Sequence, residues 1–362
     1  MRSQWVDIAK GFAILAVVLF HINYNFPDSK LLPVTALFGY AWHVPVFFLI
    51  GGFFIKEERL VQPVGFIKGK IKSLYQLLLY FYIPAVCLHN MLLDIGWYDT
   101  ATDYGGKSMS YWSVTQTLKE LLLAVCLAGR EPILGAMWFV YVLFMALCGF
   151  SIISWMVKKA FKDEQQYEWV RLIILLGLCM LSCTASRLFD FTIPRFSNVI
   201  TAMWLIYCGC KLKNQFHWSF TNPYICCLSA MILYHSATLC VGGVSLNGNN
   251  YRDTMILTTT SVAAMYVICF FSKKLEGRWA GAFLSQCGKD SFYIMGLHFI
   301  GFKVCTLFLN GLGFNEKLSA LTAPAGNSIG LLLAYLTFGM LFPLAFMWAF
   351  RKVKATIIQR NR

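Results

Sequence analysis

The most unusual stretch of the sequence is WVDIAKGFAILAVVLFHINYNF, an apolar run that carries an acid, an amine and an imidazole. Asp7 and Lys10 stand near its start, and His21 stands near its end. If the run is helical, the eleven residues from Lys10 to His21 rise by about 16 Å and complete about three turns, so that both share one face. This spacing suits an elongated ligand with an anion at one end and a group that needs a base at the other. The residues alone also allow a simpler interpretation, in which Asp7 and Lys10 pair at a helix start.

Two further histidines lie within apolar runs, His43 in YAWHVPVFFLIGGFF and His298 in SFYIMGLHFIG. Ionisable residues inside a membrane are costly, and each is by default a candidate functional residue. The alternative for each is a neutral imidazole that is hydrogen-bonded to a neighbouring helix. Because neighbouring antiparallel spans would carry His21 and His43 in their outer halves, we expect the two to lie at similar depth.

The composition indicates a membrane protein with several spans. The chain has 362 residues, of which 58% are hydrophobic and 13% are charged, and its mean hydropathy is +0.60. Soluble domains carry about a quarter of charged residues. The net charge of +14 is interpreted as an orientation signal, and no nucleic-acid partner is expected. The 13 cysteines lie mostly in apolar runs without metal-ligand spacing, so neither a metal nor a disulfide framework is expected.

A span needs about 20 largely apolar residues. The sequence predicts an all-α polytopic protein of about ten transmembrane helices that forms a single domain over residues 1–362. The stretch 117–128 is too short to cross and is expected to be interfacial or re-entrant. The predicted spans are 5–24, 37–55, 73–93, 134–157, 170–187, 196–210, 223–242, 255–271, 291–309 and 328–350.

The charges of the connecting segments predict the orientation. With the N-terminus inside, most of the 31 Lys and Arg residues fall on inner segments, as the positive-inside rule requires. Both termini are therefore expected to be cytoplasmic, in the inner (plasma) membrane. The first span carries charges and lacks a cleavage site, so we interpret it as uncleaved.

Two other groups of polar residues could bind ligands. Lys68, Lys70 and Lys72 precede the third predicted span on its inner side, where they could bind a nucleotide phosphate or simply anionic lipid. On the outer side, charged residues near span ends could bind a polar acceptor such as a sugar, or could anchor the helices at the interface. Those taken as candidate substrate-binding residues are Glu131, Arg187 and Arg195.

Several of these motifs resemble one known family. WVDIAKGFAILAVVLFH resembles the opening of the integral-membrane acyltransferase family 3, in which an Asp, a basic residue and a His share the first span. The family more often has Arg where this chain has Lys10, and the lysine resembles the fucose-4-O-acetylase-like branch. Three further segments resemble the family: the pattern H-x-P-x-F-F-x-x-(S/G)-G, met by His43, Pro45, Phe47, Phe48, Gly51 and Gly52; GAMWFVYVLF around Trp138; and GKDSFYIMGLHF with His298.

The resemblance implies a membrane O-acyltransferase that takes a short acyl group, usually acetyl, from cytoplasmic acyl-CoA. Its acceptor would be a hydroxyl of a surface or exported polysaccharide, or of the lipid-linked precursor. Lys10, Lys68, Lys70 and Lys72 would then bind the phosphates of acetyl-CoA. His21 would act as a general base or as a transient acyl carrier. His43 would orient His21 or bind the thioester carbonyl, and His298 would contact the substrate.

Two rival functions remain at this stage. Ten spans with intramembrane histidines also suit a transporter or exporter of polysaccharide or lipid-linked glycan, although the sequence has no evident repeat. A lipid-linked glycosyltransferase would need an acidic pair on an outer loop, for which Asp94, Asp99 and Asp103 are candidates. Dependence on acyl-CoA would separate the acyltransferase from both rivals.

Overall fold

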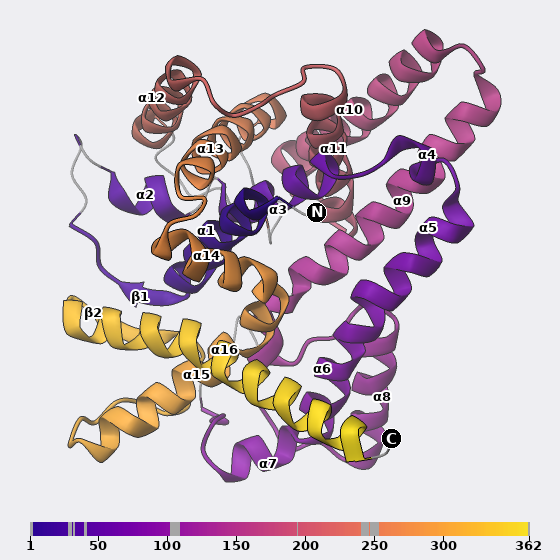
Figure 1. Cartoon of the computed structure of the whole chain (residues 1–362). Helices are drawn as coiled ribbons and strands as arrows, with labels where there is room; N and C mark the ends of the chain where they lie inside the picture. Colours follow the sequence, from indigo (N-terminus) through magenta and orange to yellow (C-terminus); the bar gives the residue numbers. More distant parts are fainter. Residues whose placement is uncertain are drawn as a thin grey trace. The chain divides into compact units, whose positions relative to one another are not determined.

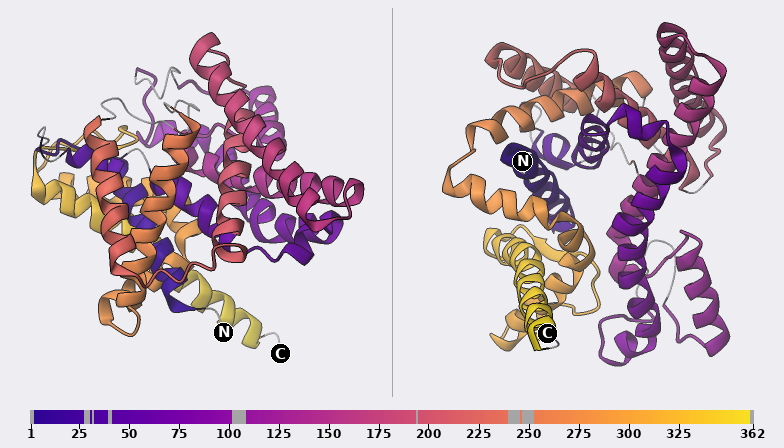
Figure 2. Two further views of the ribbon diagram at one scale, coloured as in Figure 1. Left: turned by 90° about the horizontal axis from the view of Figure 1, so that it is seen from above. Right: turned by 45° about the vertical axis from the view of Figure 1, so that its right-hand side comes forward.

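The protein is almost entirely helical (Figures 1 and 2). The structure is a computed structural model that describes residues 3–27, 31, 33–39, 42–101, 109–193, 195–239, 246 and 253–360. Within these residues the only strands are β1 (Ile22–Tyr24) and β2 (Ala323–Gly326). Helices predominate because a backbone in hydrocarbon must satisfy its own hydrogen bonds. The expected all-α class is therefore confirmed.

Five helical segments of the described chain are long and apolar enough to cross a membrane. They coincide with the fourth, fifth, eighth, ninth and tenth predicted spans, which identifies a polytopic membrane protein. The remaining predicted spans coincide with shorter or less apolar helices, so the count of ten stays a prediction. The five segments are Pro132–Ala160, Glu164–Phe189, Thr254–Lys274, Ser291–Gly311 and Ile329–Thr356.

The chain folds into two compact units. The first comprises Met1–Ala9, Pro27–Leu78 and Trp138–Gly281, and the second comprises Lys10–Phe26, Leu79–Met137 and Ala282–Arg362. Three helices continue from one unit into the other: α1 (Gln4–Phe20), α6 (Gln76–Cys87) and α14 (Trp279–Lys289).

The first unit is built around a close pair of helices, α3 and α11. Gly52 on α3 and Gly209 on α11 allow the contact, because a Cβ at Gly52 would lie only 1.9 Å from the carbonyl oxygen of Ile206. Glycines permit such an approach in membrane helices, so Gly52 serves helix packing. The elements of this unit are α2 (Val34–Gly39), α3 (His43–Phe53), α4 (Glu57–Leu60), α5 (Pro63–Lys70), a π-helix (Ile71–Tyr75), α9 (Trp138–Ala160), α10 (Glu164–Phe189), α11 (Phe196–Asn214), α12 (Pro223–Leu239) and α13 (Thr254–Lys274).

The second unit packs α15 against α16 (Figure 1). A Cβ at Gly301 on α15 would lie 2.6 Å from the carbonyl oxygen of Phe338 on α16, so these two helices also meet at a glycine. Beside them β1 and β2 pair in parallel. The elements that lie wholly in this unit are β1, α7 (His89–Asp94), α8 (Val114–Val125), a 3₁₀-helix (Pro132–Met137), α15 (Ser291–Gly311), β2 and α16 (Ile329–Arg360).

The helices differ from the predicted spans at several ends. The first span was expected over 5–24, but α1 ends at Phe20 and the next residues form β1. The third was expected over 73–93, but its helix already begins at Pro63 and breaks at Leu88. Hydropathy detects only the apolar part of a helix, and the stretch from Pro63 to Lys72 is too polar for it. The lysines before the third span therefore lie on a helix.

Two other predictions concern short helices. The second span, expected over 37–55, contains the end of α2 and the whole of α3, and residues 40–41 between them lie outside the described residues. The segment 117–128 corresponds to α8 (Val114–Val125), which Ser113 caps by accepting a hydrogen bond from the backbone N–H of Gln116. With 12 residues, this helix is too short to cross the membrane.

Candidate functional site

The imidazole of His21 is anchored by the helix that precedes it. The backbone N–H of His21 donates to the carbonyls of Val17 and Val18 at 3.3 and 3.1 Å, so the residue continues the last turn of α1. Its Nδ1 lies 2.8 Å from the same Val17 carbonyl oxygen. A carbonyl can only accept, so Nδ1 carries the proton and the Nε2 of the neutral ring carries a lone pair. The half-buried ring therefore presents Nε2 as a base or nucleophile.

His298 on α15 repeats this arrangement in a fully buried place. Its Nδ1 lies 3.0 Å from the carbonyl oxygen of Ile294, so the proton again sits on Nδ1. Its side chain is buried, and its Nε2 has no hydrogen-bond partner among the described residues. A buried acceptor without a donor costs about 1–3 kcal/mol.

The two imidazoles lie side by side within the second unit. The ring centroids of His21 and His298 are 5.1 Å apart, with an interplanar angle of 44°. Phe299 packs against both rings, with centroids 4.9 Å from that of His21 and 4.3 Å from that of His298. Both histidines were predicted as site residues, but the sequence did not predict that they meet.

The short parallel sheet fixes the backbone on the other side of His21. The carbonyl of His21 accepts a hydrogen bond from the backbone N–H of Ala323 at 3.1 Å. Asn23 donates through Nδ2 to the hydroxyl of Thr322 at 2.8 Å. His21 is thus held by α1 on one side and by the segment before α16 on the other.

Lys10 and His21 belong to one continuous helical run, as the sequence predicts. The eleven residue steps from Lys10 to His21 correspond to a rise of about 16 Å. The half-buried Lys10 is followed by Gly11, where a Cβ would lie 2.1 Å from the carbonyl oxygen of Leu284 on α14. Close packing of α1 on α14 therefore sets the position of α1 at the level of the lysine.

The three lysines before the third predicted span lie on two consecutive helical segments of the first unit. Lys68 and Lys70 are in the last turn of α5, and Lys72 is in the π-helix. Lys68 and Lys72 are exposed, whereas Lys70 is half-buried and its ammonium lies 5.0 Å from the ring centroid of Phe66. Burial lowers the pKa of Lys70. Lys68 and Lys72 are thus the two solvated cations of this group.

His43 is the first residue of α3 and is buried, with 8% of its surface exposed. It lies in the first unit, and its ring packs against that of Trp42 at a centroid distance of 6.4 Å. His21 lies in the second unit, so the expected interaction of His43 with His21 stays a prediction.

Nearly the whole chain matches one protein-family model. The model is described as an acyltransferase domain, and it matches residues 3–351. The chain belongs to acyltransferase family 3. No curated protein and no solved structure matches it. The family, together with the apolar helices, makes the protein a membrane acyltransferase.

In this acyltransferase, Glu131 is part of a buried network. It is 1% exposed, and its carboxylate lies 3.2 Å from Nδ1 of His89 and accepts a hydrogen bond of 2.5 Å from the hydroxyl of Tyr98. The other ring nitrogen of His89 lies 3.1 Å from the carbonyl oxygen of Ser110, and the ring stacks on Trp112 at 3.5 Å. Glu131 was predicted to contact the substrate, but its carboxylate is already hydrogen-bonded to Tyr98 and close to His89.

The other two outer-side candidates lie near the loop between α10 and α11. Arg187 is exposed in the last turn of α10. Arg195 precedes α11 with a φ of 65°, and its guanidinium carbon lies 4.8 Å from the ring centroid of Tyr141 on α9. Arg187 is therefore the more accessible of the two for a ligand.

The described acidic residues that were considered for a glycosyltransferase have different partners. Asp94 accepts a hydrogen bond from the exposed Tyr111 at 2.9 Å, and Asp99 lies 3.5 Å from the ammonium of Lys317. Asp103 lies outside the described residues. Nor do the described residues hold a group of three or more His, Cys, Asp or Glu side chains placed to bind a metal ion.

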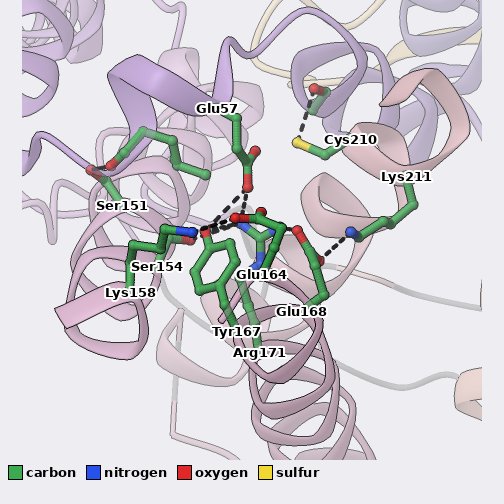
Figure 3. A network of polar contacts seen from close by, with 12 residues as sticks. Glu57, Ser151, Ser154, Lys158, Glu164, Tyr167, Glu168, Arg171, Cys210 and Lys211 are labelled. Atoms are coloured by element: carbon green, nitrogen blue, oxygen red, sulfur yellow. Dashed lines mark hydrogen bonds and ion pairs between the residues drawn. The ribbon is translucent and has the colours of Figure 1, made fainter. Parts of the chain in front are cut away.

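Sequence reasoning missed an ion-pair network in the first unit (Figure 3). Arg171 on α10 is 1% exposed and donates to Glu57 on α4, and to Glu168 at 2.7 Å. Lys211 on α11 donates to the other carboxylate oxygen of Glu168. The network joins three helices of the first unit, α4, α10 and α11. The sequence did offer one indication of this network, because Arg171 lies near the start of the predicted span 170–187.

Sequence reasoning also missed Lys303, a buried lysine on α15. Its ammonium donates to the carbonyls of Trp97, Leu318 and Ala320 at 2.9, 2.6 and 2.7 Å, so all three N–H donors are used. A lysine in an apolar span is conspicuous in the sequence. Its partners could not be predicted, because every residue has a backbone carbonyl. This lysine fastens two connecting segments of the second unit to α15.

Proposed function

We propose that the protein is an O-acyltransferase that moves an acetyl or other short acyl group from cytoplasmic acyl-CoA to a glycan hydroxyl. The acceptor is a surface or exported polysaccharide or its lipid-linked precursor. The observation that carries the proposal is the Nε2 lone pair of His21, set by the Nδ1 contact with Val17, in a chain of an acyltransferase family.

In this mechanism His21 acts as a general base. Its Nε2 takes the proton of the acceptor hydroxyl while the hydroxyl oxygen attacks the thioester carbonyl. The tetrahedral intermediate then collapses, the carbon–sulfur bond breaks, and the imidazolium returns the proton to the departing thiolate. The products are the ester and free CoA. His43 contributes by orienting His21 or by binding the thioester carbonyl.

The donor enters from the cytoplasmic side in this proposal. Its phosphates bind Lys10 and the lysines Lys68, Lys70 and Lys72, and its arm extends along α1 over the rise of about 16 Å to His21. Glu131, Arg187, Arg195 and His298 are the residues proposed to bind the acceptor. The ten spans, cytoplasmic termini, single domain, fucose-4-O-acetylase-like branch and inner-membrane location belong to the same proposal.

Transfer of labelled acetyl from acetyl-CoA into the glycan fraction of membranes tests this function. The His21→Ala variant should lose transfer by about 10²- to 10⁴-fold, because it lacks the base. His235→Ala is the matched control, since His235 is an exposed histidine on α12. Size-exclusion chromatography of both variants confirms that folded protein is present. Near-normal transfer by His21→Ala would rule out this mechanism.

The donor site has a separate test in Lys10. Replacement by Gln removes a point charge from the phosphates, so the KM for acetyl-CoA should rise about tenfold while the KM for the acceptor stays unchanged. Initial rates at varied acetyl-CoA concentration give both constants. An effect on the acceptor constant alone would move Lys10 out of the donor site.

A further inference from the structure

Two imidazoles whose Nδ1–H groups are already engaged lie next to each other in the second unit. Both imidazoles use Nδ1–H on a carbonyl of their own helix, so each has only the lone pair of Nε2 to offer. The rings are 5.1 Å apart between centroids. His298 is buried, and its Nε2 has no partner among the described residues.

The phenyl rings that pack on this pair in the described part of the chain cannot donate a hydrogen bond to it. The aromatic neighbours are Phe20, whose centroid is 5.4 Å from that of His21, Phe302, at 5.6 Å from His298, and Phe299 between the two histidines. Phenyl rings have no N–H or O–H group. The described residues thus leave the Nε2 of His298 without a donor, and a bound molecule with an O–H group could supply one.

A single acceptor hydroxyl does not satisfy both histidines. A hydroxyl carries one proton, and general-base catalysis commits that proton to His21. The partner of His298 must be a second O–H group on a neighbouring atom. Adjacent hydroxyls of one sugar ring would each donate an O–H···N bond of about 2.8 Å, one to each imidazole.

We propose that the His21–His298 pair recognises a vicinal diol of a sugar ring. His21 receives the proton of the hydroxyl that is acylated, and His298 accepts a hydrogen bond from the adjacent hydroxyl. This inference rests on the proposed function and deepens it, because it names the chemistry by which the acceptor is selected. A water molecule, which also carries two donors, is the competing occupant.

Binding to the purified full-length protein in detergent separates the two occupants. The probes are the methyl α-pyranosides of glucose, galactose and mannose and their monodeoxy analogues, and the readout is the melting temperature against probe concentration. We expect at least one glycoside to stabilise the wild-type protein. The matching deoxy analogue should bind about tenfold more weakly, because one hydrogen bond is lost.

Variants assign the effect to His298. His298→Phe should weaken glycoside binding about tenfold and leave binding of the deoxy analogue unchanged, whereas His298→Gln, which keeps an acceptor, should restore part of the preference. His235→Phe controls for general sugar effects. Equal affinity for glycosides and deoxy analogues, or no binding of any probe, overturns the inference in favour of water. Transfer from acetyl-CoA without a preference for glycosides over deoxy analogues would refute only this inference and leave the proposed function standing. A preference for glycosides without transfer would support diol binding and refute the proposed function.

Discussion

Two buried histidines of the second unit, His89 and His298, illustrate opposite ways of placing an imidazole inside this protein. Both ring nitrogens of His89 have acceptors, Glu131 on one side and the carbonyl of Ser110 on the other. Both nitrogens of His89 are thus engaged in hydrogen-bond contacts. His298 has one nitrogen engaged and one without a partner among the described residues.

We propose that this difference separates a structural histidine, His89, from a functional one, His298. A fully paired polar group stabilises the fold, whereas a buried unpaired one costs stability and is retained for another reason. Burial alone did not make the distinction, since both side chains are almost completely buried. The number of ring nitrogens that have a hydrogen-bond partner distinguishes the two histidines. Experiments can test this distinction.

The largest effect is expected from Glu131→Ala. It leaves His89 buried without its carboxylate, which should lower the free energy of unfolding by about 3–5 kcal/mol. Chemical denaturation in detergent measures this loss. Asp94→Ala is the control, since Asp94 pairs with the exposed Tyr111 and should cost less than about 1 kcal/mol. Equal losses of unfolding free energy in the two variants would show that His89 does not have a structural role.

A smaller loss in the free energy of unfolding is expected from Lys303→Met. The three carbonyls that Lys303 serves would lose their donor, at a cost of about 2 kcal/mol, although the methionine keeps the packing of the stem. Lys317→Met is the matched control, because the Lys317 side chain is 60% exposed and its pair with Asp99 contributes little. The same denaturation experiment compares them. A harmless Lys303→Met would show that the carbonyls find other partners.

The smallest effect, and of opposite sign, is expected from His298→Phe. It removes an unpaired acceptor from an aromatic surrounding, so the free energy of unfolding should stay constant or rise by up to about 1 kcal/mol. The same replacement at His89 should cost about 2 kcal/mol, because it strands the Glu131 carboxylate. Melting temperatures of the two variants test the comparison directly. A loss of stability in His298→Phe would place both histidines in the structural class.

The sequence predicted the helical class and the longest spans because these depend on local hydropathy. It also identified His21, Lys10 and His298 as candidates, since ionisable residues are conspicuous in apolar runs. It did not predict the contact of His21 with His298, which depends on the packing of α1 and α15. Nor did it predict the end of α1 at Phe20, because β1 forms only by pairing with residues about 300 positions away. Lys303 escaped for a similar reason, as its partners are backbone carbonyls.

The parallel pairing of β1 with β2 also has a consequence for biosynthesis. The backbone of His21 is held by Ala323, so a ribosome must synthesise the chain as far as Ala323 before that hydrogen bond can form. Such a long sequence separation delays the contact during folding. A nascent or truncated chain would insert its first helix with the histidine present but not yet constrained. Under the proposed function, a chain that ends before Ala323 would therefore transfer acyl groups more slowly than the longer chain, because its His21 is less constrained.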